Sequence, residues 1–317
     1  MKETCDRRSF LKNSLTATTG IGLTLSGGLL AKTAAWANQP ASGSIPKQPL
    51  GKTGHNVGIF SLGGETTVEQ PAKRDEAIEI INHAIDLGVN YIDTAALYGR
   101  EGSGRLPGAS EINIGSVMKD RRDEVFLATK SHDYTYDGTM RLFEDSIRRL
   151  QTDYVDLYQH HYVGNFGTLE DLRRKPSARH AFEKLKEEGV IKNIGITGHS
   201  SRLLWEALKD YPYDCVLITL NAGHRSMNDT EYLDRFFDLA TEKNVGVIAM
   251  KVAHRGRMLR PDLTIRQLLP YTMSYPVSTT IMGITAKEYL DENVRIASSF
   301  EKLSESEMSE IRHLALS

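Results

Sequence analysis

Short apolar runs alternate with longer amphipathic stretches along the chain from about residue 58 onward. Apolar runs of about four to eight residues are typical of buried strands, and amphipathic stretches with a period near 3.6 are typical of helices packed on one face. Eight apolar runs predict strands at 59–62, 91–95, 125–130, 154–161, 192–197, 215–220, 245–251 and 279–284. Eight amphipathic stretches predict helices at 75–87, 110–119, 138–150, 178–188, 201–209, 229–243, 263–274 and 287–299. This alternation predicts a parallel sheet in an α/β protein.

Helix-end signals and the number of units refine the architecture. Gly88 and Gly189 follow predicted helices at the position where a glycine ends a helix, and Ser304 with Glu307 forms a capping-box pattern that predicts a last helix at 304–314. Eight strand–helix units over residues 50–317 predict a single-domain (β/α)8 TIM barrel, a fold that takes about 250 residues. A doubly wound open sheet is the alternative, but no Gly-x-Gly-x-x-Gly follows the first strand.

Residues 1–37 read as an export signal. Arg7 and Arg8 lie within a twin-arginine motif at 6–12, a mildly apolar stretch covers 15–31, and Ala35-Trp36-Ala37 is a small-x-small cleavage signal. We therefore expect the twin-arginine export machinery as a partner, a periplasmic location, a mature chain that begins at Asn38, and a linker at 38–49. A buried or membrane-anchoring helix, or an uncleaved signal, is the alternative.

Composition excludes several classes of protein. The 317 residues are 40% hydrophobic and 25% charged, which is ordinary for a globular protein and excludes disordered, collagenous and disulfide-scaffold chains. A net charge of −2 gives no footprint for nucleic acid, and no apolar run after residue 37 reaches the ~20 residues that cross a bilayer. We thus expect no nucleic acid and no membrane for the mature form. With Cys5 removed, Cys215 alone allows neither an internal disulfide nor an iron–sulfur extension.

Polar side chains gather at the carboxyl ends of the predicted strands, where a TIM barrel builds its active site. Asp93 and Tyr98 follow the second strand, Lys130 ends the third and His161 ends the fourth. These four suit carbonyl reduction, in which the developing alkoxide needs a proton donor. Tyr98 would give the proton, with its pKa lowered by Lys130. Asp93 would orient Lys130, and His161 would position the carbonyl oxygen.

The motifs around these residues resemble the aldo/keto reductase family. The resemblance lies in Leu50-Gly51-Lys52-Thr53-Gly54, Ile92-Asp93-Thr94-Ala95 with Tyr98-Gly99, Ala128-Thr129-Lys130, Asp153-Tyr154-Val155-Asp156-Leu157-Tyr158-Gln159-His160-His161, and Gly246-Val247-Ile248-Ala249-Met250-Lys251. It implies an NAD(P)-dependent oxidoreductase that reduces an aldehyde, ketone, sugar or quinone to an alcohol by hydride transfer. The family's catalytic tetrad falls on Asp93, Tyr98, Lys130 and His161. The resemblance also implies a nicotinamide cofactor that lies across the barrel mouth without a Rossmann domain.

The same resemblance implies a set of cofactor-binding residues: Thr197, Gly198, Asn221, Lys251, Arg257, Gly283, Thr285, Glu292 and Asn293. Two departures stand out. Thr197-Gly198 replaces the usual Ser-Asn pair, and Gly283 and Tyr289 stand where the family often has basic residues for a 2′-phosphate. That phosphate would need Lys287 or the Arg255/Arg257 pair. NADP(H) is the family default, and NAD(H) stays open.

Two other classes of protein remain as alternatives. A metal-dependent barrel hydrolase is suggested by five histidines just past strand ends, namely His132, His161, His199, His224 and His254. The second alternative is a non-catalytic relative that binds the nicotinamide nucleotide. We expect no metal site.

Three further groups of residues carry predictions. His160 alternates with His161 and should point toward the helices. Asp156 is either a satisfied buried carboxylate or a functional group. The residues expected along the substrate pocket wall are His132, Tyr134, Tyr136, Tyr162, Asn165 and Phe166.

Overall fold

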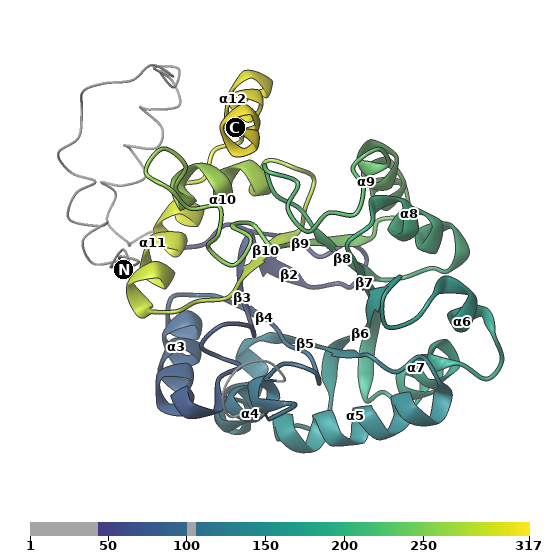
Figure 1. Cartoon of the computed structure of the whole chain (residues 1–317). Helices are drawn as coiled ribbons and strands as arrows, with labels where there is room; N and C mark the ends of the chain where they lie inside the picture. Colours follow the sequence, from purple (N-terminus) through teal and green to yellow (C-terminus); the bar gives the residue numbers. More distant parts are fainter. Residues whose placement is uncertain (1–43, 100–105) are drawn as a thin grey trace, which may run out of the picture.

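Eight parallel strands form a closed barrel surrounded by helices (Figure 1). The computed structural model describes residues 44–99 and 106–317. The strands follow one another around the barrel in chain order, β3 to β10, with β10 hydrogen-bonded back to β3. The predicted (β/α)8 barrel is confirmed. The twin-arginine motif, the cleavage signal and residues 38–43 lie outside the described residues.

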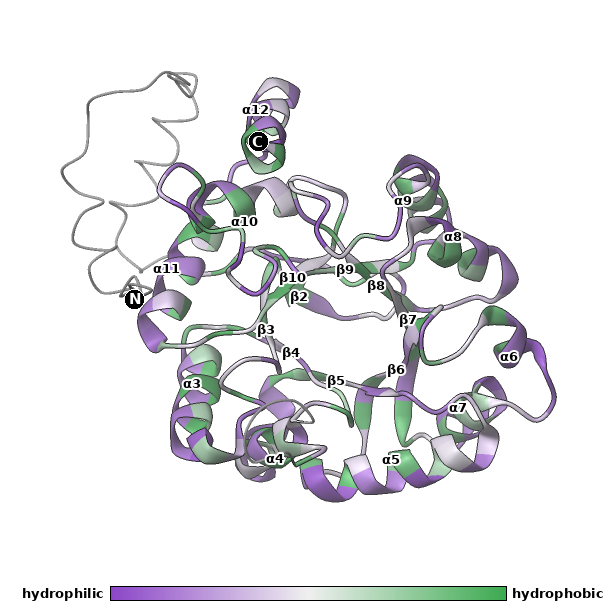
Figure 2. Cartoon of the chain, in the orientation of Figure 1, coloured by the Kyte–Doolittle hydropathy of each residue, from purple (hydrophilic) through white to green (hydrophobic). Residues whose placement is uncertain are grey.

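The predicted strands are all present, with ends that differ by up to two residues. The barrel strands are β3 (Phe60–Gly63), β4 (Tyr91–Asp93), β5 (Phe126–Ser131), β6 (Val155–Val163), β7 (Ile191–Gly198), β8 (Cys215–Thr219), β9 (Gly246–Met250) and β10 (Thr279–Met282). The helices are α3 (Arg74–Asp86), α4 (Ala109–Arg121), α5 (Tyr136–Leu150), α6 (Leu169–Arg173), α7 (Ala178–Glu187), α8 (Ser201–Asp210), α9 (Leu233–Glu242), α10 (Ile265–Met273), α11 (Lys287–Ser298) and α12 (Glu305–Leu316). Figure 2 shows both hydrophobic and hydrophilic residues on these helices, as expected for helices with one face on a barrel and one in solvent.

Helix ends follow the capping signals. Ser304 accepts the backbone N–H of Glu307, and the Glu307 carboxylate accepts the backbone N–H of Ser304, so the predicted capping box of α12 is confirmed. The one-turn helix α6 was not predicted, because its apolar residues are too few to show a period, although Thr168 and Asp171 cap it in the same way. No helix among residues 44–99 and 106–317 is long and apolar enough to cross a membrane.

Side-chain alternation along the strands separates the barrel interior from the layer under the helices. Leu157 of β6 packs inside the barrel, whereas its neighbour Tyr158 packs in the outer layer. His160 also points outward and stacks on Phe182 of α7 with ring centroids 4.0 Å apart, which confirms that it faces the helices. Asp156 is buried and accepts hydrogen bonds from Arg122 and from a backbone N–H of β5. The structure therefore supports the structural interpretation of Asp156.

A hairpin of β1 (Lys47–Pro49) and β2 (Asn56–Gly58) closes the amino-terminal end of the barrel. Residues 47–49, at the end of the expected linker, thus form β1. Leu50, in the hairpin turn, is fully buried and belongs to the cluster that fills the barrel interior. Gly51 has a φ of +52°, and a Cβ there would lie 2.2 Å from the backbone nitrogen of Gly246, so only glycine fits. The closed end leaves the carboxyl ends of the strands as the open mouth.

Candidate active site

The four predicted catalytic residues meet at the barrel mouth. Asp93 ends β4, Lys130 lies near the end of β5, His161 lies near the end of β6, and Tyr98 is in the loop after β4. Lys130 Nζ donates to the Asp93 carboxylate and lies 3.5 Å from the Tyr98 hydroxyl oxygen. The Tyr98 and His161 rings are 5.9 Å apart and nearly perpendicular. An amine, a carboxylate, a phenol and an imidazole are thus within reach of one another.

The Lys130–Asp93 ion pair is buried, with both side chains only 1% exposed. Lys130 Nζ also donates to the backbone oxygen of Thr94 at 2.7 Å. The second Asp93 oxygen accepts from Gln159 Nε2 at 3.1 Å and from the Tyr91 hydroxyl at 3.4 Å. A buried charge persists only when it is paired and hydrogen-bonded, and these contacts provide both.

Gln159 and Tyr91 are site residues that the sequence interpretation missed. The signal that identifies them is strand alternation, because each lies two residues before a predicted catalytic residue on the same strand. Both therefore point into the barrel, directly below the mouth.

The protonation states favour a neutral His161 and a protonated Tyr98. Burial and then the positive charges of Lys130 and other neighbours lower the pKa of His161 well below its usual value. Burial and then the negative charges of Glu65, Asp93 and Glu69 raise the pKa of Tyr98 well above its usual value. We expected Lys130 to lower the pKa of Tyr98. The opposite direction arises first because the phenol is buried, and then because the carboxylates of Glu65, Asp93 and Glu69 lie near it.

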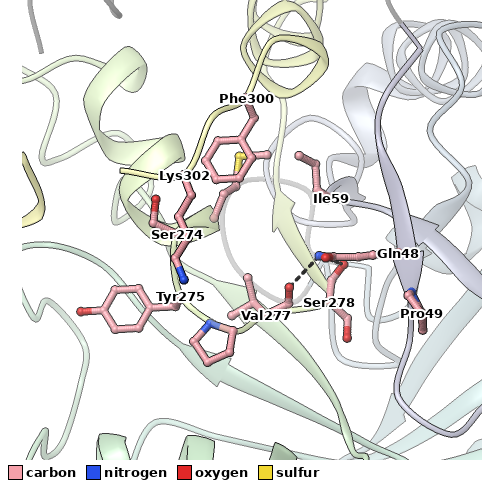
Figure 3. Close-up of a pocket in the computed structure, with 11 residues that line it drawn as sticks. Gln48, Pro49, Ile59, Ser274, Tyr275, Val277, Ser278, Phe300 and Lys302 are labelled. Carbon is pink, nitrogen blue, oxygen red and sulfur yellow. Dashed lines mark hydrogen bonds between the residues drawn. The ribbon is translucent and has the colours of Figure 1, made fainter. Parts of the chain in front are cut away.

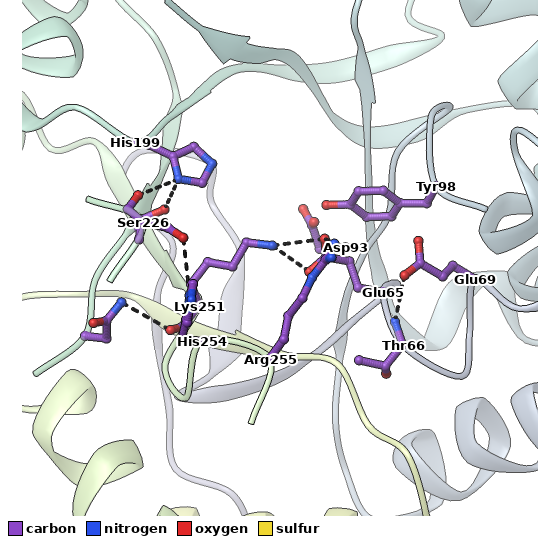
Figure 4. Close-up of polar contacts among 12 residues, drawn as sticks. Glu65, Thr66, Glu69, Asp93, Tyr98, His199, Ser226, Lys251, His254 and Arg255 are labelled. Atoms are coloured by element: carbon purple, nitrogen blue, oxygen red, sulfur yellow. Dashed lines mark hydrogen bonds and ion pairs between the residues drawn. The ribbon is translucent and has the colours of Figure 1, made fainter. Parts of the chain in front are cut away.

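A second ion-pair cluster lies beside Tyr98 (Figure 4). Glu65, in the loop after β3, accepts from Lys251 Nζ at 3.0 and 2.8 Å and from Arg255 at 2.7 Å. Burial raises the pKa of Glu65, but Lys251 and Arg255 outweigh it and bring the value to about 2. Neighbouring Glu69 instead accepts two backbone N–H groups, those of Thr66 and Gly99. Glu65 and Glu69 were not predicted, since nothing near them in sequence indicates that the distant residues 251 and 255 converge there.

The predicted cofactor residues on β7 and β8 are built into the mouth. Thr197 and Gly198 are buried at the end of β7, and the Thr197 hydroxyl accepts the backbone N–H of Tyr162 at 2.8 Å. Asn221 is buried after β8, where its amide donates to the backbone oxygens of Arg225 and Lys251. The Asn221 amide therefore ties the loop after β8 to residue 251.

The remaining predicted cofactor residues lie toward α11. Gly283 follows β10, Thr285 is exposed, and Asn293 is buried with its amide against the sulfur of Met282. Arg257 is exposed in the loop after β9. Glu292 pairs with Arg266 of α10 at 2.8 Å.

The structure also places the cations considered for a 2′-phosphate. Lys287 pairs with Glu79 of α3, and Arg255 pairs with Glu65 at the mouth. Arg266, which we did not predict, contacts Glu292 of α11.

Aromatic side chains surround Phe166, in the loop after β6, and form one wall of the mouth next to His161. Phe166 is 37% exposed, and its ring centroid lies 5.3 Å from that of His161, 6.0 Å from His132 and 5.9 Å from Tyr162. Tyr134 lies underneath, where its hydroxyl donates to the backbone oxygen of His161. The mouth therefore has a polar catalytic side and an aromatic side.

Two other features do not add to this site. Among residues 44–99 and 106–317, no group of three or more His, Cys, Asp or Glu side chains could hold a metal ion, so the predicted histidines do not form the ligand set that a metal-dependent hydrolase needs. A surface pocket lies at the opposite end of the barrel, between Gln48 of β1, Val277 and Phe300 (Figure 3). That pocket is formed where the strands begin, away from the four predicted catalytic residues.

Comparisons with known proteins agree with this geometry. The family model described as "Aldo/keto reductase family" matches residues 56–268. "Uncharacterized oxidoreductase YqkF" of Bacillus subtilis is 28% identical over 300 residues, which cover 81% of this chain and 90% of that protein. "L-galactose dehydrogenase" of Arabidopsis thaliana is 26% identical over 298 residues, covering 82% and 90%. The solved "aldo-keto reductase AKR11C1 from Bacillus halodurans (holo form)" is 25% identical with a TM-score of 0.69, covering 85% of this chain and 96% of that one.

Proposed function

The chain belongs to the aldo/keto reductase family, and we propose that it is an NAD(P)-dependent oxidoreductase that reduces a carbonyl to an alcohol with Tyr98 as the proton donor. One observation carries the assignment of Tyr98. The Lys130 amine contacts both the Asp93 carboxylate and the Tyr98 hydroxyl at the mouth. A phenol held by a charged amine is the acid that such a reduction requires.

The residues present fit a nicotinamide nucleotide. Lys251 and Arg255 already bind a carboxylate at the mouth, and the same two cations suit the oxygens of a diphosphate. Thr197 and Gly198 lie at the end of β7, and Glu292 and Asn293 lie on α11, where the Asn293 amide contacts Met282 at the end of β10. The bound cofactor supplies the hydride.

Four residues of the chain hold, transfer and position the proton of the reaction. Tyr98 holds it at neutral pH, because burial and nearby carboxylates raise the pKa of this phenol. Lys130 stabilises the phenolate that forms when Tyr98 gives up its proton, and Asp93 holds the Lys130 amine in place. His161 is neutral and has one N–H with which to position the carbonyl oxygen.

The substrate is a small carbonyl compound or the corresponding alcohol. The mouth joins polar groups to the wall of Phe166, His132 and Tyr162, which suits sugars, quinones and small aldehydes. The relative described as L-galactose dehydrogenase supports including sugars among the candidates.

The test follows absorbance of NADPH and NADH with a panel of carbonyls. Tyr98→Phe should lower turnover by about a hundredfold or more, the scale of losing a general acid, with little change in nucleotide affinity. A fully active Tyr98→Phe enzyme would refute Tyr98 as the donor. Nucleotide binding without turnover in the unmodified protein would instead favour the non-catalytic alternative.

We also propose that the protein is exported to the periplasm by the twin-arginine machinery. Arg7, Arg8 and the Ala35-Trp36-Ala37 signal support the proposal. This pathway carries proteins that have already folded, which would let the chain acquire its cofactor before export.

A further inference from the structure

Two cations at the mouth converge on one carboxylate that the proposed reaction does not use. Lys251 contacts both oxygens of Glu65, and Arg255 contacts one of them (Figure 4). The carboxylate therefore accepts three charge-assisted hydrogen bonds from two residues. Phosphate oxygens accept the same bonds from the same donors.

The loop that carries the two cations is held in an unusual conformation. Lys251, His254 and Arg255 have φ values of +65°, +47° and +57°, in the left-handed region that residues other than glycine rarely adopt. Such residues cost free energy and cluster at ligand sites, where the surroundings fix them. Here the backbone N–H of His254 donates to the oxygen of Lys251, to which the Asn221 amide also donates. These hydrogen bonds stabilise a loop conformation in which Lys251 and Arg255 both contact Glu65.

The pair is open enough to exchange partners. The side chains of Lys251, Glu65 and Arg255 are 17%, 20% and 41% exposed. The Lys130–Asp93 pair, in contrast, is 1% exposed on both sides. An incoming anion has access to the first cluster and none to the second.

We propose that Glu65 is an internal counter-ion of Lys251 and Arg255, and that the diphosphate of a nucleotide displaces it on binding. The inference rests on the proposed function, because the diphosphate is that of the nicotinamide nucleotide. Binding has to break three hydrogen bonds to Glu65 and to oppose its negative charge. Glu65 therefore lowers the affinity of the mouth for nucleotide, and makes the two cations unavailable to weaker anions.

The test compares Glu65→Gln with Glu69→Gln in the full-length protein, using inorganic diphosphate and NADPH as separate probes. Both variants remove one negative charge near the mouth, but only Glu65 contacts the two cations. By calorimetry, Glu65→Gln should bind diphosphate about tenfold more tightly, and Glu69→Gln should stay within about threefold of the unmodified protein. NADPH, followed by protein fluorescence, should show the same order.

A second pair of variants keeps the proposal testable if Glu65→Gln folds poorly. Lys251→Met and Arg255→Met should each weaken diphosphate binding by about tenfold, because each removes one cation from the anion. Melting curves of all variants identify any loss of folding.

Three outcomes would overturn the inference: weaker diphosphate binding by folded Glu65→Gln, equal gains in both glutamine variants, or unchanged affinity in both methionine variants. If diphosphate binds as expected but neither NADPH nor NADH binds, the proposed function fails and the anion site stands. If NADPH binds and Glu65→Gln does not tighten it, only the inference about Glu65 fails.

Discussion

Replacing Lys130 with methionine tests how the buried ion pair serves both stability and chemistry. Methionine is of similar length and fills most of the same volume, so packing changes little. Asp93 would keep Gln159 and Tyr91 as hydrogen-bond donors but lose its counter-ion, while only 1% of its side chain is exposed. Removing one partner of a buried pair costs about 3–5 kcal/mol, because the other charge is left uncompensated.

The double variant Lys130→Met/Asp93→Asn separates the charge from the packing. Asparagine keeps an oxygen that accepts from Gln159 and Tyr91, and no buried charge remains. We therefore expect the double variant to recover most of the stability that Lys130→Met loses, to within about 1–2 kcal/mol of the unmodified protein. Turnover should be lower than in the unmodified protein by about a hundredfold or more in both variants, because Tyr98 has lost the neighbouring Lys130 in each.

The pH dependence of the free energy of unfolding of Lys130→Met provides a second test. In Lys130→Met, burial raises the pKa of Asp93 with no lysine to oppose it, so the folded state holds its proton more strongly than the unfolded chain, whose pKa is about 3.9. The stability deficit should be small below about pH 4 and should grow by up to about 1.4 kcal/mol per pH unit above it.

Urea unfolding followed by far-UV circular dichroism at several pH values measures these differences. If the urea midpoint of Lys130→Met at neutral pH equalled that of the unmodified protein, the reasoning would be refuted. A double variant less stable than Lys130→Met would also refute it, because both results would mean that the pair carries no buried charge.

Three further predictions concern other parts of the molecule. In the unmodified protein, we expect the affinities for NADPH and NADH to differ by about tenfold or less, because Gly283 and Tyr289 provide no cation for the 2′-phosphate. If Arg266 supplies that cation, Arg266→Ala should weaken NADPH binding more than NADH binding, which fluorescence titrations with each nucleotide measure. The rate of carbonyl reduction should stay constant from neutral pH to beyond pH ~10, because the raised pKa of Tyr98 keeps this proton donor protonated. The rate of alcohol oxidation, which needs the deprotonated phenol as a base, should rise with pH over the same range. A reduction rate that falls from pH ~7 upward would contradict this. Replacing Arg7 and Arg8 with lysine should hold the protein in the cytoplasm, and amino-terminal sequencing of the periplasmic form should begin at Asn38.

The barrel, and the convergence of the candidate catalytic residues at its mouth, could be predicted because their signals are local. Each strand is a short apolar run, and Asp93, Lys130 and His161 each lie at the end of one. Barrel topology then brings these ends together without further information. Strand alternation was enough to point His160 outward, as its stacking on Phe182 confirms.

The features that were missed depend on long-range contacts. The strand β1 is three residues long and is stabilised by pairing with β2 and by the burial of Leu50 in the barrel, neither of which has a periodic signal. Glu65 lies 186 residues from Lys251, and its role follows only from the geometry of the mouth. The predicted direction of the Tyr98 pKa shift was wrong because the sequence interpretation counted one lysine, whereas burial of the phenol and then the nearby carboxylates raise this pKa.

The mouth contains two lysine–carboxylate pairs of the same chemistry, and their burial gives them different roles. Lys130–Asp93 is closed to solvent, so no dissolved anion can replace the carboxylate, and the charge on Lys130 stays fixed beside Tyr98. Lys251–Glu65 is partly open, so a dissolved anion can take the place of the carboxylate. Tyr98 lies beside both pairs, and the negative charges of Glu65 and Asp93 both raise its pKa. The difference in exposure therefore gives Tyr98 one carboxylate that stays with its lysine, Asp93, and one that an incoming anion can displace, Glu65.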